Sequence, residues 1–127
     1  MPEMPDTDIP KIKPWVNKLK LETLDKDKKV AKVIFVAPWV RLANLSSDDE
    51  WKIAKPWLET SIDFSKVKNK AKSFIALFSD NDQWVPLKEN VDMFKEKLNP
   101  KIVVLKNKGH FSEDEGVREL PEILNYI

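Results

Sequence analysis

The sequence predicts an α/β fold, with a parallel sheet of about three strands flanked by helices. Three short apolar segments, 33–37, 73–78 and 101–105, have the composition of strands that are buried on both faces. Segments with helical periodicity separate them, and this alternation favours parallel pairing through right-handed crossovers. We therefore expect a single domain over residues 1–127.

The chain before the first strand is expected to be an extended leader followed by helices. Residues 1–8 are acidic and rich in proline, which is the opposite of a signal peptide. Asp8 is a suitable N-cap for a first helix, and residues 21–29 resemble the polar end of a second helix. The apolar stripe of the first helix consists of Ile12, Trp15, Val16 and Leu19.

Between the first and second strands, residues 39–63 are expected to form an irregular excursion that carries three tryptophans, with one short helix inside it. Helical periodicity, capping residues and proline positions then predict the remaining helices. The four helices expected after the first strand are 48–54, 66–72, 87–98 and 119–127.

Composition indicates a soluble protein of the cytoplasm. The formal net charge is +1, with 34% charged residues and no cysteine, which excludes disulfides and thiolate zinc sites. The apolar run 33–37 is far too short to span a membrane. Asp25 and Asp27 intervene around the lysines at positions 26 to 32, and no aromatic residue lies among them, so they indicate a solvated helix end. We expect neither nucleic acid nor a membrane as a partner.

The two residues best suited to acid–base chemistry follow neighbouring predicted strands. Asp82 comes shortly after strand 73–78, and His110, the only histidine, comes shortly after strand 101–105. Because parallel strands end at the same edge of a sheet, we expect these side chains to meet there. A carboxylate that accepts the imidazole Nδ1–H orients the ring for proton transfer. Asp80 is the competing acid.

Four spaced blocks of the sequence resemble the YdeN and retinoblastoma-binding-protein-9 group of small serine hydrolases. These blocks are VAPW (36–39), FIALFSDNDQWVPL (74–87), GHF (109–111) and ELPEIL (119–124). The resemblance implies a compact α/β-hydrolase fold, ester or amide substrates and no cofactor. It also implies that Asp82 and His110 are the acid and base of a catalytic triad.

Two motifs of that family are missing from the sequence. A Gly-x-Ser-x-Gly nucleophile elbow cannot exist here, because the only glycines are Gly109 and Gly116. The first strand of the family, which ends in His-Gly, is absent as well. Residues 15–20 resemble the helix before the elbow strand, and residues 21–24 resemble the end of the helix after it. We therefore expect a partial α/β-hydrolase from which an internal segment has been deleted.

These departures predict that the isolated chain is not a competent hydrolase, although it keeps the acid and the base. Ser79 and Ser112 lie near Asp82 and His110 in the sequence, but we expect both to be loop hydroxyls. Two alternatives remain open. The chain is either a non-catalytic interaction module on the hydrolase scaffold, or a fragment that another chain completes by supplying the elbow.

Aromatic residues near these motifs are candidates for an apolar substrate pocket, which would take a small ester or amide. The candidates are Trp39, Trp84 and Phe111. The run from Asp80 to Asp82 resembles the start of a calcium loop, but Trp84 and Val85 stand where an oxygen ligand and a glycine belong. We therefore expect no metal.

The deletion also predicts an interaction surface. In the resembled fold the elbow strand pairs beside the strand that contains residues 33–36. Its loss leaves an apolar strand with unpaired backbone groups, and such an edge is a template for association. We therefore expect self-association or a partner chain along residues 33–36.

Overall fold

The computed structural model describes residues 30–127, so the expected leader and the helices before the first strand lie outside the described residues. The described chain falls into two compact units. One unit includes residues 45–62, and the other includes residues 30–44 and 63–127. The second unit contains the sheet and the candidate site.

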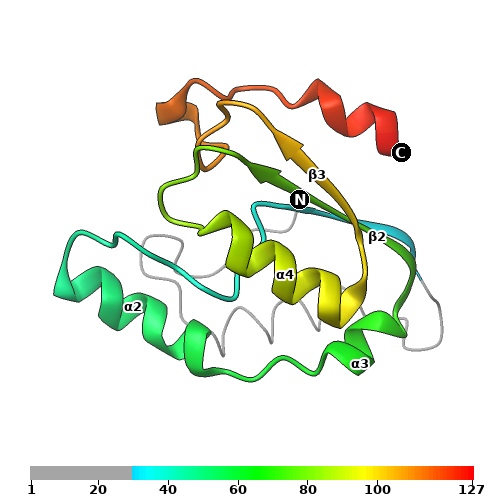
Figure 1. Cartoon of the computed structure of the whole chain (residues 1–127), viewed down its shortest axis with the longest axis horizontal. Helices are drawn as coiled ribbons and strands as arrows, with labels where there is room; N and C mark the ends of the chain where they lie inside the picture. The colour runs from blue at the N-terminus through cyan, green and yellow to red at the C-terminus, as the bar shows by residue number, and fades with distance from the viewer. Residues whose placement is uncertain (1–29) are drawn as a thin grey trace. The chain divides into compact units, whose positions relative to one another are not determined.

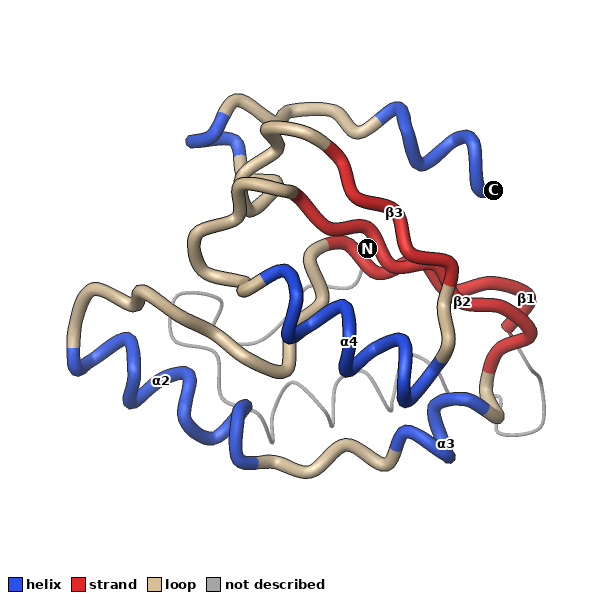
Figure 2. The backbone as a smooth tube through the Cα atoms, in the orientation of Figure 1, coloured by secondary structure: helices blue, strands red, loops and turns tan. Residues whose placement is uncertain are grey.

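The sheet has three parallel strands in the order β1-β2-β3 (Figure 1). β1 spans Val30–Val36, β2 spans Ala71–Ser79 and β3 spans Lys101–Leu105. In the register, Ile75 of β2 lies between Ile34 of β1 and Lys101 of β3. The predicted fold class, a parallel three-stranded sheet flanked by helices, is confirmed (Figure 2).

Helix α4, Leu87–Leu98, begins and ends where the sequence predicts. Pro86 precedes it, and Asn99 ends it in the left-handed region, where its N–H donates to the carbonyls of Phe94 and Lys95. Phe94 lies at the centre of the core, and its ring packs against the rings of three other phenylalanines. These are Phe35, Phe64 and Phe78. Burial of this aromatic cluster fixes α4 against one face of the sheet.

Helix α3 is shorter and begins earlier than the predicted helix 66–72. It spans Phe64–Lys68, because Asp63 caps it, with the Asp63 carboxylate accepting the N–H of Lys66 at 3.1 Å. The chain turns after α3, and β2 already begins at Ala71. The predicted extension of this helix to residue 72 is therefore wrong.

In the other unit, helix α2 spans Asp48–Glu59 and extends beyond the predicted end near Ala54. The hydroxyl of Ser47 accepts the N–H of Glu50, and the Glu50 carboxylate accepts the N–H and hydroxyl of Ser46. These bonds, first of all the backbone N–H of Ser46, lower the pKa of Glu50. The helix continues through Pro56, which removes only one backbone donor.

The end of the chain forms 3₁₀ helices and not the predicted α-helix 119–127. Helix η1 spans Glu113–Glu115 and η2 spans Pro121–Tyr126. The side chain of Leu124 is 71% exposed, so η2 lacks the well-packed face that sustains an α-helix. Lys32 donates to the carbonyl of Tyr126, which attaches the end of η2 to β1.

No helix in the part of the chain that the structure describes is long and apolar enough to cross a membrane.

Candidate active site

The candidate site lies where the two neighbouring strands β2 and β3 end. Parallel strands deliver their carboxyl ends to the same edge, so the loops that follow them run side by side. The N–H of Asp80 donates to the carbonyl of Leu105 at 3.0 Å, which continues the pairing one residue beyond β2. The loop after β2 thus begins in register with the loop after β3.

Side chains at the end of β2 and in the loop after it bind consecutive backbone N–H groups of the second loop. Each acceptor is a side-chain oxygen of residues 79–81, and each donor belongs to residues 107–109. The bonds join Asn107 to Asp80 at 2.9 Å, Lys108 to the hydroxyl of Ser79 at 3.0 Å and Gly109 to Asn81 at 2.8 Å. Ser79 in turn donates its hydroxyl to Asn81 at 2.8 Å. The two loops are therefore fixed to each other up to the residue before His110.

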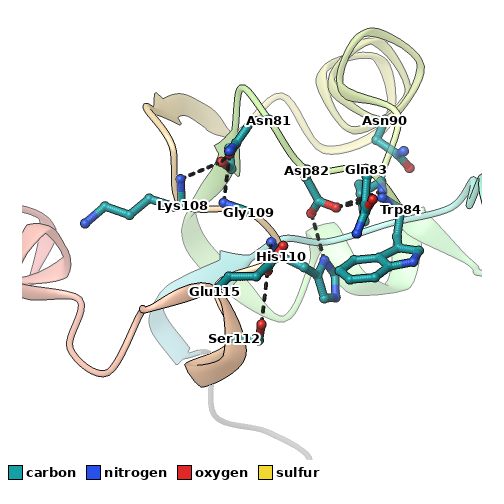
Figure 3. Close-up of polar contacts among 12 residues, drawn as sticks. Asn81, Asp82, Gln83, Trp84, Asn90, Lys108, Gly109, His110, Ser112 and Glu115 are labelled. Carbon is teal, nitrogen blue, oxygen red and sulfur yellow. Dashed lines mark hydrogen bonds and ion pairs between the residues drawn. The ribbon is translucent and has the colours of Figure 1, made fainter.

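The third residue of the first loop, Asp82, binds the side chain of His110. Oδ2 of Asp82 lies 2.7 Å from Nδ1 of His110, and the Asp82 side chain is only 3% exposed (Figure 3). Oδ1 of the same carboxylate accepts the N–H groups of Trp84 and Val85, both at 3.0 Å. Because an ionised carboxylate only accepts, Nδ1 must carry the proton and the Nε2 lone pair is free to take one. The competing acid Asp80 binds Asn107 instead.

A tight turn presents His110. The N–H of Phe111 donates to the carbonyl of Lys108 at 2.9 Å, and Gly109 at the first central position has a φ of +53°. That position favours glycine in turns of this kind. Phe111 also has a positive φ, +57°, which is strained for a bulky residue. The imidazole thus lies between two left-handed residues.

Among the three aromatic candidates, the structure brings Trp84 to the imidazole. The Trp84 and His110 rings meet edge to face, with their centroids 5.9 Å apart. Phe111 is the next residue after His110, and both Phe111 and Trp39 are half-buried. Trp84 thus covers part of the imidazole, which remains 36% exposed.

Sequence reasoning missed Asn90, which fixes the segment after β1 to α4. Asn90 is completely buried. Its Oδ1 accepts the N–H groups of Val40 and Arg41, at 2.7 and 3.0 Å. Its Nδ2 donates to the carbonyls of Arg41 and Pro86, at 3.0 and 2.8 Å. A buried asparagine with all four bonds made is expensive to replace. A polar residue on the core side of a predicted amphipathic helix was the available signal.

Sequence reasoning also missed Glu115, because it stands in the run Glu113-Asp114-Glu115, which resembles a solvated turn. The Glu115 carboxylate accepts the backbone N–H of His110 and, at 3.0 Å, the hydroxyl of Ser112. It therefore binds the backbone that carries the imidazole.

An ion pair joins the same loop to helix η2. Nζ of Lys108 lies 2.9 Å from Oε1 of Glu122, and both side chains are about three-quarters buried, at 26% and 31% exposure. The hydrogen bond from Lys108 lowers the pKa of Glu122. The residue two positions before His110 is thereby tied to the end of the chain.

No group of three or more histidines, aspartates or glutamates among residues 30–127 could hold a metal ion. Every serine of the sequence also lies in this part of the chain, since the first is Ser46. Ser79 and Ser112, the two nearest the acid and base in sequence, use their hydroxyls to bind Asn81 and Glu115. Both hydroxyls therefore bind side chains two or three residues further along the chain.

The parallel sheet, with Asp82 and His110 in contact beyond the carboxyl ends of β2 and β3, defines a partial α/β-hydrolase fold. The family model described as "Serine hydrolase" matches residues 12–127, so the chain belongs to the serine hydrolase family. The family predicted from the sequence blocks is therefore confirmed.

The chain is similar to the crystal structure of the ydeN gene product from B. subtilis. The TM-score is 0.80 and the sequence identity is 21%, and the match covers 98% of this chain and 77% of that one. A similarity at this identity supports the fold. A comparison with curated proteins gives no match.

Proposed function

We propose that the chain holds the acid and base of a serine hydrolase site for small esters or amides, with Asp82 and His110 in these roles, but lacks the serine nucleophile. The observation that supports this proposal is the 2.7 Å contact between Asp82 Oδ2 and His110 Nδ1. The Asp82 carboxylate in this contact is buried. Such a contact fixes the imidazole tautomer and stabilises the imidazolium formed when Nε2 takes a proton. As an isolated chain, the protein is then a pseudoenzyme.

The surroundings of the imidazole support a role in proton transfer. Trp84 excludes water from one side of the ring, and the exposed remainder leaves room for a ligand. Trp39, Trp84 and Phe111 are the proposed apolar lining of a pocket for that ligand. Neither a metal nor an organic cofactor enters this chemistry, which needs only a base and an oriented nucleophile.

Two observations support the proposal that the chain lacks the nucleophile, namely the glycine content of the sequence and the bonding of the serine hydroxyls near Asp82 and His110. A serine becomes reactive when a base accepts its proton and donors bind the oxyanion. With only two glycines, the chain cannot form the elbow that exposes such a serine. Ser79 is 2% exposed and bonded to Asn81, and Ser112 is bonded to Glu115. Neither serine is arranged as a nucleophile.

A fluorophosphonate probe tests this proposal, because it labels activated serines covalently. We expect no labelling of the purified chain by intact-mass spectrometry, under conditions that label an intact serine hydrolase completely. Rapid labelling of one serine per chain that His110→Ala abolishes would overturn the proposal. Peptide mapping would then identify the serine, with Ser79 and Ser112 examined first.

A second candidate function is that of an interaction module or fragment completed by another chain, which binds along residues 33–36. The strand order favours it, since β1 is an outer strand and pairs only with β2 within residues 30–127. Val36 at the end of β1 is 40% exposed. An unpaired apolar edge accepts a further strand.

Sedimentation velocity over a hundredfold range of concentration tests this second candidate. We expect wild type to self-associate and Val36→Lys to shift towards monomer, because a lysine on an edge strand opposes further pairing. Lys66→Glu on the exposed surface of α3 is the control for a charge change elsewhere. A stable monomer whose amides at residues 33–36 exchange rapidly with solvent would contradict this candidate.

A further inference from the structure

We propose that Glu115 is a positioning residue for His110, and that its carboxylate sets the imidazole geometry through the backbone. The side chains of residues 79–81 bind the N–H groups of residues 107–109 one by one. The next N–H, that of His110, has no acceptor in that loop, because the Asp82 carboxylate is occupied by the imidazole and two other N–H groups. Glu115 supplies the acceptor instead.

The carboxylate reaches His110 over the face of Gly109. A methyl group at Gly109 would lie 2.3 Å from both Cδ and Oε1 of Glu115, which is closer than real contacts allow. The bare Cα of Gly109 is therefore what lets the carboxylate approach. Figure 3 shows Glu115 beside Gly109 and His110, with Ser112 on its other side.

Local structure holds Glu115 in this place. The short helix η1 brings its N–H to the carbonyl of Ser112 at 3.1 Å, while the Ser112 hydroxyl donates to the carboxylate at 3.0 Å. Gly116 then ends the turn with a φ of +82°. Two donors, the hydroxyl of Ser112 and the N–H of His110, thus orient one carboxylate.

The consequence for the imidazole is mechanical. A tight turn leads into His110, and a strained residue, Phe111, follows it. A hydrogen bond from the N–H of His110 is therefore needed to hold its backbone in place. A shift of about 1 Å in the ring would break the contact with Asp82, since a hydrogen bond at 3.6 Å is lost. Glu115 touches no reacting atom and acts only through the position of His110.

A positioning role for Glu115 matters only if His110 is the base, so the inference rests on the proposed function. The experiment, however, observes the imidazole directly. Because His110 is the only histidine, its ring nitrogens can be assigned without ambiguity in a ¹⁵N–¹H correlation spectrum. In wild type we expect one tautomer, with the proton on Nδ1 and a protected, far-downfield Nδ1–H resonance. Labelling of a serine by the fluorophosphonate probe would overturn the proposed function but would leave the expectation for this spectrum unchanged.

Three variants separate positioning from general stability. Glu115→Met keeps the length of the side chain but removes the acceptor, so we expect a mixture of tautomers and at least a fivefold loss of the Nδ1–H signal. Glu115→Gln keeps a carbonyl oxygen for both donors and should restore the signal. Asp114→Asn changes an exposed acid of the same turn and should resemble wild type.

The proposal is overturned if folded Glu115→Met keeps the single Nδ1–H tautomer and the protected resonance. It is also overturned if Glu115→Gln, while folded, loses the signal as completely as Glu115→Met. If Glu115→Met does not fold, Glu115→Ala takes its place, because it also removes the acceptor and is judged by the same outcome.

Discussion

Oδ2 of Asp82 lies 2.7 Å from Nδ1 of His110, while Oδ1 of the same carboxylate accepts two backbone N–H groups at 3.0 Å. Backbone N–H groups of the loop that follows β2 therefore orient the Asp82 carboxylate. The imidazole cannot rotate away without leaving a carboxylate oxygen buried and unpaired, which costs free energy. Orientation of the ring is thus a property of the two loops together.

Replacement of Asp82 by asparagine should reverse the tautomer of His110. The amide carbonyl can still accept the N–H groups of Trp84 and Val85, but the amide nitrogen then faces Nδ1 and donates to it. The proton must move to Nε2, which removes the free lone pair. We expect the downfield Nδ1–H resonance to vanish, with the free energy of unfolding changed by less than about 1.5 kcal/mol.

Asp80→Asn is the matched control for this experiment. Asp80 is exposed and uses one oxygen to accept the N–H of Asn107, which an amide carbonyl can also do. The resonance should therefore persist in this variant. Its loss in Asp80→Asn, together with its survival in Asp82→Asn, would show that the wrong acid has been assigned.

The two glycines should respond differently to alanine. Both have a positive φ, which costs alanine about 1–2 kcal/mol. A Cβ at Gly116 meets nothing within 4 Å, whereas a Cβ at Gly109 meets the Glu115 carboxylate at 2.3 Å. We expect urea denaturation to give a loss of about 1–2 kcal/mol for Gly116→Ala and about 2–4 kcal/mol for Gly109→Ala.

The extra loss at Gly109 should depend on Glu115. In the Glu115→Ala background, Gly109→Ala should cost only the backbone term of about 1–2 kcal/mol, because the clashing carboxylate is gone. Equal costs in both backgrounds would indicate that the carboxylate moves aside freely.

Asn90→Ala should be among the most destabilising substitutions in α4. It leaves the N–H groups of Val40 and Arg41 without their acceptor in a buried setting, at a cost of about 2–4 kcal/mol. Asp92→Ala, on the exposed side of the same helix, removes only a surface ion pair and should cost under about 0.5 kcal/mol. Chemical denaturation measures both, and similar values for the two variants would refute the role of Asn90.

The Lys108–Glu122 pair should make stability depend on acid pH. The pKa of Glu122 is lowered in the folded chain from its ordinary value of 4.5, chiefly by the hydrogen bond from Lys108. A group with a depressed pKa stabilises the fold above its unfolded pKa, and this contribution disappears as pH falls through the folded value. We expect wild type to exceed Glu122→Gln in Tm at pH 7, with the difference disappearing below pH 4.5. A constant difference between pH 3 and 7 would contradict this.

Local signals predicted the elements nearest the site well. Strand β3 and helix α4 have the predicted bounds, because Pro86 and the Asn99-Pro100 pair interrupt the chain at fixed places. The predicted end of α2 near Ala54 was wrong. The helix is capped by Ser47 and continues past Pro56 to Glu59. The predicted α-helix 119–127 was wrong as well. Its sequence has helical periodicity, but none of its apolar side chains is buried, and the segment forms the 3₁₀ helix η2.

The contact between Asp82 and His110 could be predicted from the sequence because each residue follows a strand of a parallel sheet. Their supporting residues could not. Asn81 and Asn90 bind backbone N–H groups far away in the sequence, and Glu115 binds the N–H of His110, five residues earlier. A polar residue carries no local sign of such a partner. Only the three-dimensional register of the loops reveals these contacts.

Release of p-nitrophenolate from p-nitrophenyl acetate in a stopped-flow instrument tests the central claim most directly, because it separates an acyl-enzyme step from simple base catalysis. We predict no burst, and a slow steady release that falls to the rate of buffer in His110→Ala. A burst of one p-nitrophenolate per chain would reveal a working nucleophile and contradict the account. A steady rate that His110→Ala leaves unchanged would contradict the assignment of His110 as the base.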